Sequence, residues 1–312
     1  MQTSLRGIFL TVLAGFSWGL SGACGQYLFQ NYPFDALLVT TVRLLIAGLI
    51  LVILNCFKYK KESFAIFKNK KDLLDLVRFA IFGLLPGQLF FLMAVEEANA
   101  GTATIMQYSA VILLVIYVCF KEKRSPKFSE LAALFLVLTG TILLATRGNF
   151  ASLYLTPKAL TFGFLAALGS AFANVLPDRL IRKYSVKIII GYGMLFNGIL
   201  LSIYESTQKI EGTIDLNVLL AMSGIVILGT VIGFDLYFQG VTAIGPAKAS
   251  MLCSAEPVSA TILAAFWLGT VFVPTDIVAI VLVLSAVMIL SYEALKKNES
   301  KREKLRKKFN RL

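Results

Sequence analysis

The stretch ALLVTTVRLLIAGLILVILNCF, residues 36–57, decides the fold class, because Arg43 is its only charged residue. A helix rises about 1.5 Å per residue, so this stretch is long enough to cross a hydrocarbon core of about 30 Å. Outward from it, similar apolar blocks occur along the whole chain. Together they predict ten transmembrane helices, at about 7–30, 35–57, 77–95, 101–120, 130–146, 158–177, 188–204, 216–238, 247–268 and 275–293.

The composition excludes an ordinary soluble domain. Hydrophobic residues make up 57% of the 312 positions and charged residues 15%, against roughly 45–50% and about 25% in soluble domains. Ten spans of about 20 residues leave loops too short for a soluble catalytic domain. The first block should remain in the mature protein, because it is longer than the apolar core of a cleavable signal peptide.

The residues that usually carry metal or nucleophilic chemistry are sparse. The chain has no histidine, and its four cysteines stand singly within or beside apolar blocks. A zinc site, a disulfide framework and a histidine-dependent triad are therefore not expected. The sequence also lacks a nucleotide-binding loop of the GxxxxGK[ST] type, so no cofactor or metal is expected.

Basic residues are distributed unevenly over the predicted loops. With the N-terminus in the cytoplasm, the cytoplasmic segments hold 26 of the 30 Lys and Arg residues and the outer segments hold three. Because cytoplasmic loops collect Lys and Arg, both termini are predicted to be cytoplasmic. The basic C-terminal tail is interpreted as an anchor of this topology, rather than as a ligand of anionic lipid or nucleic acid.

Two stretches in opposite halves of the chain resemble each other. ANAGTATIMQYSAVILLVIYVCFKEK (98–123) and GPAKASMLCSAEPVSATILAAFWLGT (245–270) lie about 147 positions apart. Each half then holds five spans, and an odd number inverts the second half. The sequence thus predicts an all-α integral membrane protein, in which two inverted five-helix repeats, 1–147 and 148–295, enclose a central cavity and a basic cytoplasmic tail, 296–312, follows.

Local patterns along nearly the whole chain resemble the EamA-type branch of the drug/metabolite transporter superfamily. They are FSWG at 16–19, TTVRLLIAGLI around Arg43, Gln107 with Tyr108, and AEPVSA at 255–260. The resemblance implies ten helices around a cavity that is lined by the first, third, fourth, sixth, eighth and ninth of them. It also implies export of amino acids or other small metabolites.

Prolines mark where spans should bend. Pro257 removes a backbone donor and crowds the preceding turn, so the ninth span is predicted to kink or open there. Pro86 predicts similar flexibility in the third span, and Pro177 the end of the sixth. The chain has Ala110 where the family often has a proline, so the sequence does not predict a bend in the fourth span. After the ninth span, Thr270 stands where the family often has a loop glutamate.

Three ionisable residues lie inside predicted spans, where a charge costs about 2.5–3.5 kcal/mol on insertion scales and normally faces a cavity or a partner. Arg43 and Glu256 fall at similar depth and could meet, whereas Asp235 lies nearer the cytoplasm and suits an inner gate. Two interpretations of Glu256 stay open. It is a proton or substrate-amine site, or it is a structural group, paired with Arg43 or hydrogen-bonded as a neutral acid.

Mid-span polar and aromatic side chains complete the candidate pathway. Polar groups tolerate lipid poorly and are expected to point inward, either as cavity wall or as interhelical hydrogen bonds. Trp18 and Tyr108 could stack on a substrate. The predicted substrate pathway is Trp18, Arg43, Gln88, Gln107, Tyr108, Asn174, Asp235 and Glu256, with helix breaks at Pro86 and Pro257.

These features predict a secondary transporter of the inner membrane, not an enzyme. It would move a small polar or zwitterionic metabolite, such as an amino acid, by alternating access, and the resemblance favours export. The alternatives are a nucleotide-sugar carrier, which would need more cavity cations than Arg43, and a channel-like facilitator. An integral-membrane enzyme would need clustered acids or histidines. The expected partners are the metabolite, membrane lipids and, if Glu256 titrates, protons. Nucleic acid is not an expected partner, and a monomer would suffice for transport.

Overall fold

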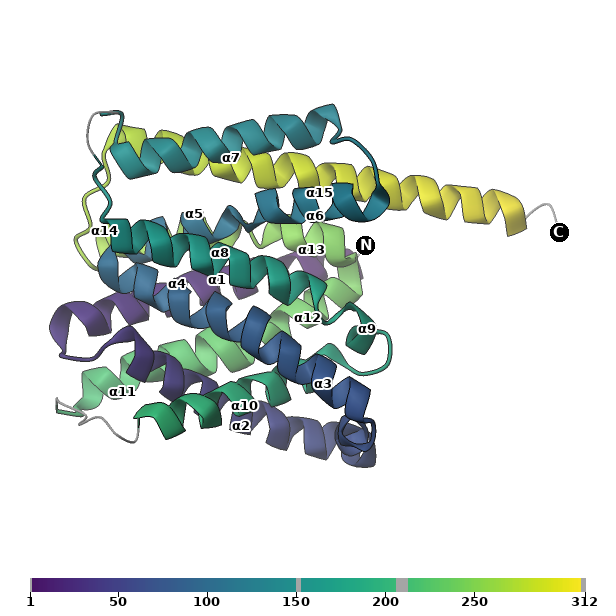
Figure 1. Cartoon of the computed structure of the whole chain (residues 1–312), viewed down its shortest axis with the longest axis horizontal. Helices are drawn as coiled ribbons and strands as arrows, with labels where there is room; N and C mark the ends of the chain where they lie inside the picture. The colour runs from purple at the N-terminus through teal and green to yellow at the C-terminus, as the bar shows by residue number, and fades with distance from the viewer. Residues whose placement is uncertain (1, 150–152, 206–212, 310–312) are drawn as a thin grey trace.

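The computed structural model describes residues 2–149, 153–205 and 213–309. Within these ranges ten helices are long and apolar enough to cross a membrane, which confirms the predicted number. They lie roughly along one common axis (Figure 1), and the described residues contain no strand. The spans are Leu5–Asn31, Ala36–Lys68, Lys70–Glu97, Ala100–Glu122, Phe128–Thr146, Pro157–Ile181, Val186–Tyr204, Leu216–Ile244, Lys248–Phe266 and Pro274–Tyr292.

Five spans lie in each half of the chain, and several consist of more than one helical segment. Because the five spans of the first half precede α8, α1 starts at the face that carries the N-terminus and α8 starts at the opposite face (Figure 1). The first half contains α1 Gln2–Asn31, α2 Ala36–Tyr59, η1 Lys60–Lys68, α3 Lys70–Phe79, η2 Ala80–Leu84, α4 Leu85–Glu97, α5 Ala100–Tyr108, α6 Ala110–Glu122 and α7 Phe128–Thr146. The second half contains α8 Pro157–Val175, α9 Asp178–Ile181, α10 Val186–Glu205, α11 Leu216–Ser223, η3 Gly224–Ile232, α12 Gly233–Ile244, α13 Pro246–Leu252, α14 Ala255–Phe266 and α15 Pro274–Phe309.

Short polar side chains set where several spans begin. In five helices the side chain of the N-cap residue accepts a hydrogen bond from a backbone N–H of the first turn. Each cap satisfies donors that no helix carbonyl can reach and contributes about 1 kcal/mol. The apolar runs therefore start at defined points. The caps are Asp35 of α2, Asn69 of α3, Asn99 of α5, Thr156 of α8 and Asp215 of α11.

The two halves meet in a nearly symmetric contact between α2 and α10. A side chain at Gly48 would collide with the backbone at Leu195, and a side chain at Gly198 would collide with the backbone at Leu45. Each helix therefore presents a glycine to the other, which allows close approach of the backbones. The reciprocal contacts relate α2 and α10 by a pseudo-twofold axis, with equivalent residues 150 positions apart.

The third and eighth spans contain widened, π-helical turns at matching positions. Pro86 has no N–H, and its ring would clash with the carbonyl four residues earlier. The chain relieves this clash in η2, where the Leu85 N–H bonds the Ala80 carbonyl, five residues back. η3 is its counterpart and has no proline; there the Thr230 hydroxyl donates to the Ile225 carbonyl at 2.8 Å. The flexibility predicted at Pro86 is thus a defined widened turn.

Each widened segment packs a glycine against the first span of the opposite half. A Cβ at Gly83 would lie 2.9 Å from the backbone of Ala173 on α8, and a Cβ at Gly229 would collide with Ser21 on α1. Gly83 therefore corresponds to Gly229, and Ala173 corresponds to Ser21. These pairs define which residues of the third and sixth spans are equivalent to residues of the eighth and first spans.

The fourth and ninth spans are both broken, at equivalent serines. The Ser109 hydroxyl, between α5 and α6, donates to the Met106 carbonyl at 2.6 Å. The Ser254 hydroxyl, between α13 and α14, donates to the Met251 carbonyl at 2.6 Å. Local side-chain bonds of this kind compete with the helical pattern. The two breaks are 145 positions apart, rather than about 147 as the sequence comparison suggested.

The breaks differ from the sequence expectation in two respects. The fourth span breaks although Ala110 stands in place of a proline, since Ser109 supplies the alternative bond. In the ninth span the break lies one turn before Pro257, because the missing N–H of a proline frees the carbonyl four residues earlier, here Cys253. Pro177 separates α8 from α9, as predicted.

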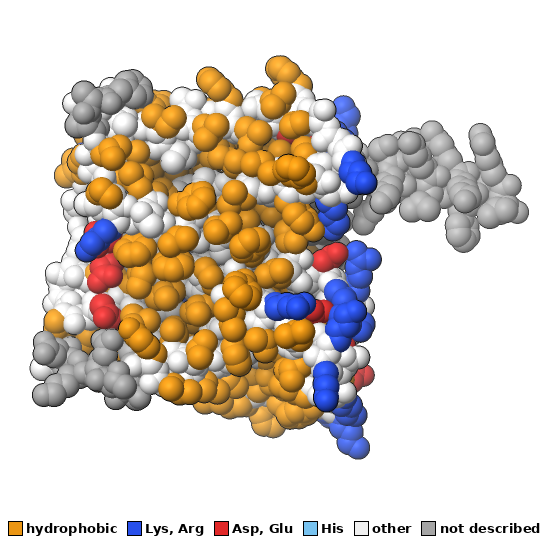
Figure 2. Space-filling view, viewed as in Figure 1, with side chains coloured by type: hydrophobic (Ala, Val, Ile, Leu, Met, Phe, Trp, Pro, Cys, Tyr) orange, Lys and Arg blue, Asp and Glu red, His pale blue; other side chains and the backbone are white. Residues whose placement is uncertain are grey.

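Basic side chains are concentrated at one end of the spans. Figure 2 shows a broad apolar belt, with most Lys and Arg side chains at the end that carries both termini; acidic side chains lie at both ends and outnumber basic ones only at the other end. We call these ends the basic face and the acidic face. The predicted basic tail continues α15 as a helix to Phe309, and its last three residues lie outside the described ranges.

Candidate functional site

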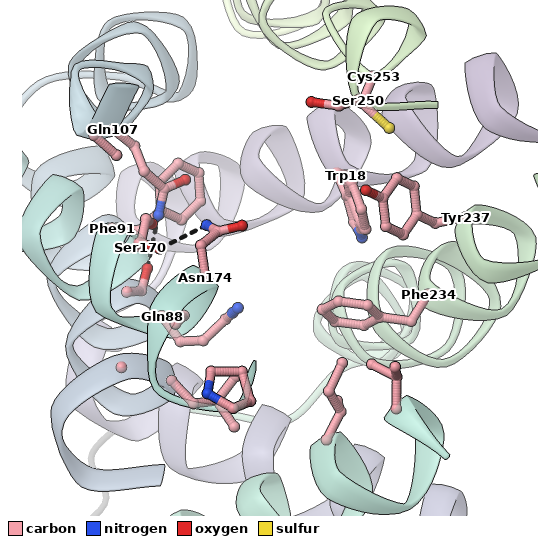
Figure 3. Close-up of a pocket in the computed structure, with 18 of the residues that line it drawn as sticks. Trp18, Gln88, Phe91, Gln107, Ser170, Asn174, Phe234, Tyr237, Ser250 and Cys253 are labelled. Carbon is pink, nitrogen blue, oxygen red and sulfur yellow. Dashed lines mark hydrogen bonds between the residues drawn. The ribbon is translucent and has the colours of Figure 1, made fainter. Parts of the chain in front are cut away.

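A cavity of about 590 Å³ lies between the two halves. The spans named by the family resemblance all contribute to its lining, and α2, α10 and α15 contribute as well. Figure 3 shows two facing walls of different chemistry. Seven of the eight predicted pathway residues line the cavity; these are Trp18, Arg43, Gln88, Gln107, Tyr108, Asn174 and Glu256.

One wall is rich in side-chain amides (Figure 3). Gln107 donates from Nε2 to the Gly87 carbonyl at 2.8 Å, and Asn174 donates from Nδ2 to the Ser170 carbonyl at 2.7 Å. The Gln88 side chain forms no hydrogen bond within the described part of the chain. Since each amide carries donors and an acceptor, this wall can bind polar groups of a ligand.

The facing wall is aromatic (Figure 3). The ring centre of Trp18 on α1 lies 5.4 Å from that of Phe234 and 5.3 Å from that of Tyr237. Phe234, Tyr237 and Phe238 of α12 line the cavity but are missing from the predicted pathway. Their spacing of three and four residues places them on one helix face, which was the available signal. This wall suits an apolar or planar part of a ligand.

Arg43 and Glu256 are the one cation and the one carboxylate among the described lining residues. Arg43 is 4% exposed and donates from Nε to the Thr230 hydroxyl at 2.9 Å. In the described structure no ion pair within 4.0 Å joins Arg43 to Glu256. The two residues share the cavity, as their depths predicted, but the structural ion pair considered for Glu256 is not formed.

Tyr108 connects the two broken spans across the interface between the halves. It ends α5, and its hydroxyl lies 3.0 Å from the Cys253 carbonyl and 3.2 Å from Oε2 of Glu256. Pro257 cannot donate to the Cys253 carbonyl as a residue four positions later usually would, and this carbonyl accepts the Glu256 N–H at 2.9 Å instead. One hydroxyl thus contacts both the opened backbone of the ninth span and the cavity carboxylate.

Ser21 is a cavity residue that the sequence interpretation missed. It is 3% exposed and lines the cavity, and its hydroxyl has no hydrogen-bond partner among the described residues. A buried hydroxyl without a partner costs about 1–3 kcal/mol. Its position in a glycine-rich helix face gave only a packing signal, because small residues are also what close helix contacts require.

Asp235 lies outside the cavity lining. It forms an ion pair with Lys187 at the start of α10, and its Oδ2 accepts a hydrogen bond from Gln239 at 2.6 Å. The position agrees with the expectation that Asp235 would not pair with Arg43, and its role as an inner gate stays a prediction. In the described ranges, no three His, Cys, Asp or Glu side chains gather in a way that could hold a metal ion.

The cavity extends toward the basic face and is closed toward the acidic face. Its lining includes Pro177, at the start of the basic segment that follows α8, and Ile181, within that segment. On the acidic side, buried apolar side chains of α1, α2, α4, α5 and α11 pack together. Gln26 strengthens this closure, because its amide oxygen accepts the Ala100 N–H at 2.9 Å and its amide nitrogen donates to the Thr270 hydroxyl at 2.8 Å.

Two successive segments of the chain, 5–146 and 157–292, each match the sequence model of the EamA-like transporter family. The chain belongs to this family. The match covers all ten spans and confirms the resemblance drawn from FSWG, Arg43 and the Glu256–Pro257 pair. This EamA family member is therefore a multi-pass membrane protein of a transporter family, with five spans in each matched segment.

Relatives of this EamA family member agree with that assignment. The "Uncharacterized inner membrane transporter YicL" of Salmonella typhimurium (strain LT2) is 35% identical over 294 residues, which cover 94% of this chain and 98% of the relative. A solved crystal structure superposes on 95% of this chain and 98% of its own, with a TM-score of 0.62 and 16% identity. At that identity the likeness shows a common fold alone.

Proposed function

We propose that this EamA family member is a secondary carrier of the inner membrane that exports small polar or zwitterionic metabolites, with amino acids as the favoured class. The observation that carries the proposal is the cavity, which is closed toward one face, extends toward the other, and combines one cation, one carboxylate, an amide wall and an aromatic wall. A site that is accessible from one side at a time is the requirement for alternating access between two repeats.

The proposed orientation places the basic face in the cytoplasm, together with both termini. Figure 2 supports this assignment, since Lys and Arg concentrate at that end of the spans, and cytoplasmic segments are enriched in these residues. The cavity then faces inward and would load its substrate from the cytoplasm. Closure at the basic face, with opening at the acidic face, would complete export.

Glu256 is proposed to bind a proton or the amine of the substrate. Its carboxylate lies in the cavity and accepts a bond from the neutral Tyr108 hydroxyl rather than from a cation. The equivalent position in the other half, 145 residues earlier, is Val111, which also lines the cavity. The fold therefore does not need a carboxylate at this position, which supports a role for Glu256 in transport.

A nucleotide-sugar carrier is less well supported by the cavity. A nucleotide diphosphate group carries at least two negative charges, and Arg43 is the one Lys or Arg among the described lining residues. Binding such a ligand would leave charge uncompensated in a site of low dielectric.

The proposal can be tested with purified full-length protein in liposomes. Counterflow of radiolabelled amino acids and other metabolites would be measured with and without a pH gradient. We expect saturable exchange that is accelerated by the same compound on the opposite side, as a carrier requires. Flux of many solutes that neither saturates nor responds to a counter-ligand would instead show a channel, and the absence of flux for all amino acids and small metabolites would reject the proposed substrate class.

A further inference from the structure

The cavity contains a group of hydrogen-bond donors without acceptors. Arg43 uses only its Nε, for Thr230, and its two terminal nitrogens have no partner among the described residues. The Ser21 hydroxyl is buried and has no partner in the same ranges. The indole N–H of Trp18 also forms no hydrogen bond there, and all three side chains line the cavity.

Residues 229–233 of the eighth span contact all three of these side chains and so place them along one side of the cavity. Thr230 orients Arg43, and its neighbour Gly229 packs directly against Ser21. One turn further, a Cβ at Gly233 would lie 2.9 Å from Nε1 of Trp18. Trp18 and Ser21 are three residues apart on α1, so they project from the same face of that helix.

We propose that Arg43, Ser21 and Trp18 form a subsite for the carboxylate group of the transported metabolite. The inference rests on the proposed carrier function and specifies its substrate class. A guanidinium offers a planar fork of donors that matches a carboxylate in two parallel bonds. A buried cation without a counter-ion is costly, and Glu256 does not supply one within 4.0 Å. A carboxylate from outside the protein would supply the counter-ion and an acceptor for the terminal nitrogens of Arg43, next to Ser21 and Trp18.

Comparison with the other half shows that the fold does not require these donors. Arg43 on α2 is equivalent to Gly193 on α10, and the contact of Arg43 with Thr230 is matched by one between Gly193 and Leu84. A Cβ at Gly193 would lie 3.3 Å from the Leu84 side chain. The same packing position is therefore filled in the other half without charge or hydroxyl.

Ser21 is equivalent to Ala173, which carries no donor, and Trp18 is equivalent to Ser170, which carries a small hydroxyl in place of an indole. The cation and the Ser21 hydroxyl therefore have no counterpart in the other half. With the carboxylate at Arg43, an amine can extend toward Glu256 and an apolar side chain toward Phe234 and Tyr237. The subsite favours amine-bearing carboxylates over amines that lack a carboxylate.

Trp18 provides a reporter for this subsite. The chain has two tryptophans, so Trp267→Phe leaves Trp18 as the only indole. The full-length single-tryptophan protein in lipid nanodiscs would be titrated with leucine, phenylalanine and serine, with the corresponding amines that lack the carboxylate, and with the corresponding acids that lack the amine. We expect saturable changes of Trp18 fluorescence for compounds with a carboxylate, and affinity about tenfold or more lower for the amines.

Variants decide whether the three donors cause this preference. Arg43→Gln should abolish the difference between amino acid and amine, and Arg43→Lys should retain part of it. Ser21→Ala should weaken carboxylate binding about threefold. Ser285→Ala removes a hydroxyl that bonds its own helix, to Val281, outside the cavity lining, and should change nothing. Size-exclusion chromatography would show whether each variant is folded. If Arg43→Gln does not fold, the effect of Ser21→Ala on carboxylate binding tests the subsite.

Two results would overturn the subsite. One is a folded Arg43→Gln or Ser21→Ala protein that binds carboxylates as well as the parent does. The other is the absence of any saturable response to the carboxylates, or equal affinity for the amines. If amines show carrier-type counterflow under these conditions, the proposed transport function stands and only the carboxylate subsite fails.

Discussion

The helix contacts of the two halves repeat, whereas the chemistry of their cavity surfaces does not. Gly48 and Gly198 make reciprocal contacts between α2 and α10, and Gly83 and Gly229 occupy equivalent widened turns. By contrast, Glu256 is matched by Val111 at an equivalent place in the cavity wall. Features that both halves need for folding are present in both. A polar group that is present in one half only is therefore not required by the fold, and we look for its role in function.

This difference separates structural from functional residues within one chain. Ser109 and Ser254 both end a broken segment with the same bond to a carbonyl three residues back. The break is therefore part of the shared architecture. Tyr108 and Cys253, one position earlier, are equivalent in the fold but have different side chains, and the tyrosine hydroxyl donates to Glu256. The asymmetric residues are thus the first candidates for substrate and proton chemistry.

The largest effect is expected where a repeated contact is blocked. Gly48→Ala and Gly198→Ala each place a methyl group against the backbone of the other helix, so each should destabilise the protein by about 1–3 kcal/mol. Gly22→Ala is the control, because its Cβ would lie at an ordinary 3.4 Å from Ala100, and helix propensity then favours alanine by up to about 1 kcal/mol. Thermal unfolding in detergent would measure all three, and equal behaviour would contradict the symmetric packing.

The next effect concerns the most asymmetric pair. Glu256→Gln keeps the shape of the side chain but removes its proton equilibrium, so transport should fall about tenfold or more and should no longer respond to a pH gradient. Val111→Thr alters the equivalent position in the other half and should retain the pH response. Uptake into liposomes would compare the two. If Glu256→Gln leaves both rate and pH response unchanged, the proton role of Glu256 is wrong.

The sequence was sufficient for features that depend on local composition. The apolar blocks predicted all ten spans, and seven of the eight predicted pathway residues line the cavity. Proline chemistry located η2 at Pro86, but η3 forms with glycines and Thr230 alone, so no proline marked it. Ser21 was missed because its role depends on which helix faces it. Local sequence patterns do not predict which helices contact each other.

A smaller effect is expected for the hydroxyl that connects the halves. Tyr108→Phe keeps the ring but removes the bonds to Cys253 and Glu256. A hydrogen bond of this kind contributes about 1 kcal/mol, so the maximal rate of counterflow should fall about fivefold, with little change in half-saturation. Tyr117→Phe, on the exposed face of α6, is the control. Equal rates for both variants would show that Tyr108 does not link the two breaks during transport.

The smallest effect is expected at the acidic face, where Tyr32 donates to both carboxylate oxygens of Asp215, at 3.0 and 2.8 Å. This bond raises the pKa of Tyr32 to about 12. Bonds from Val218 N–H and from Tyr32 lower the pKa of Asp215 below its ordinary 3.8. A carboxyl group with a lowered pKa stabilises the fold above its unfolded-state pKa, and this contribution is lost as the pH falls through the lowered value.

Neither member of the pair therefore changes its charge between about pH 5 and pH 9. Tyr32→Phe should leave the pH profile of transport unchanged over this range, as should Tyr184→Phe, which removes the comparable bond to Asp72 at the basic face. Uptake rates measured across the range would test both variants beside Glu256→Gln. A shifted profile in either tyrosine variant would mean that the pH response arises at a face of the protein. Unchanged profiles in both, with a lost response in Glu256→Gln, would locate it in the asymmetric cavity.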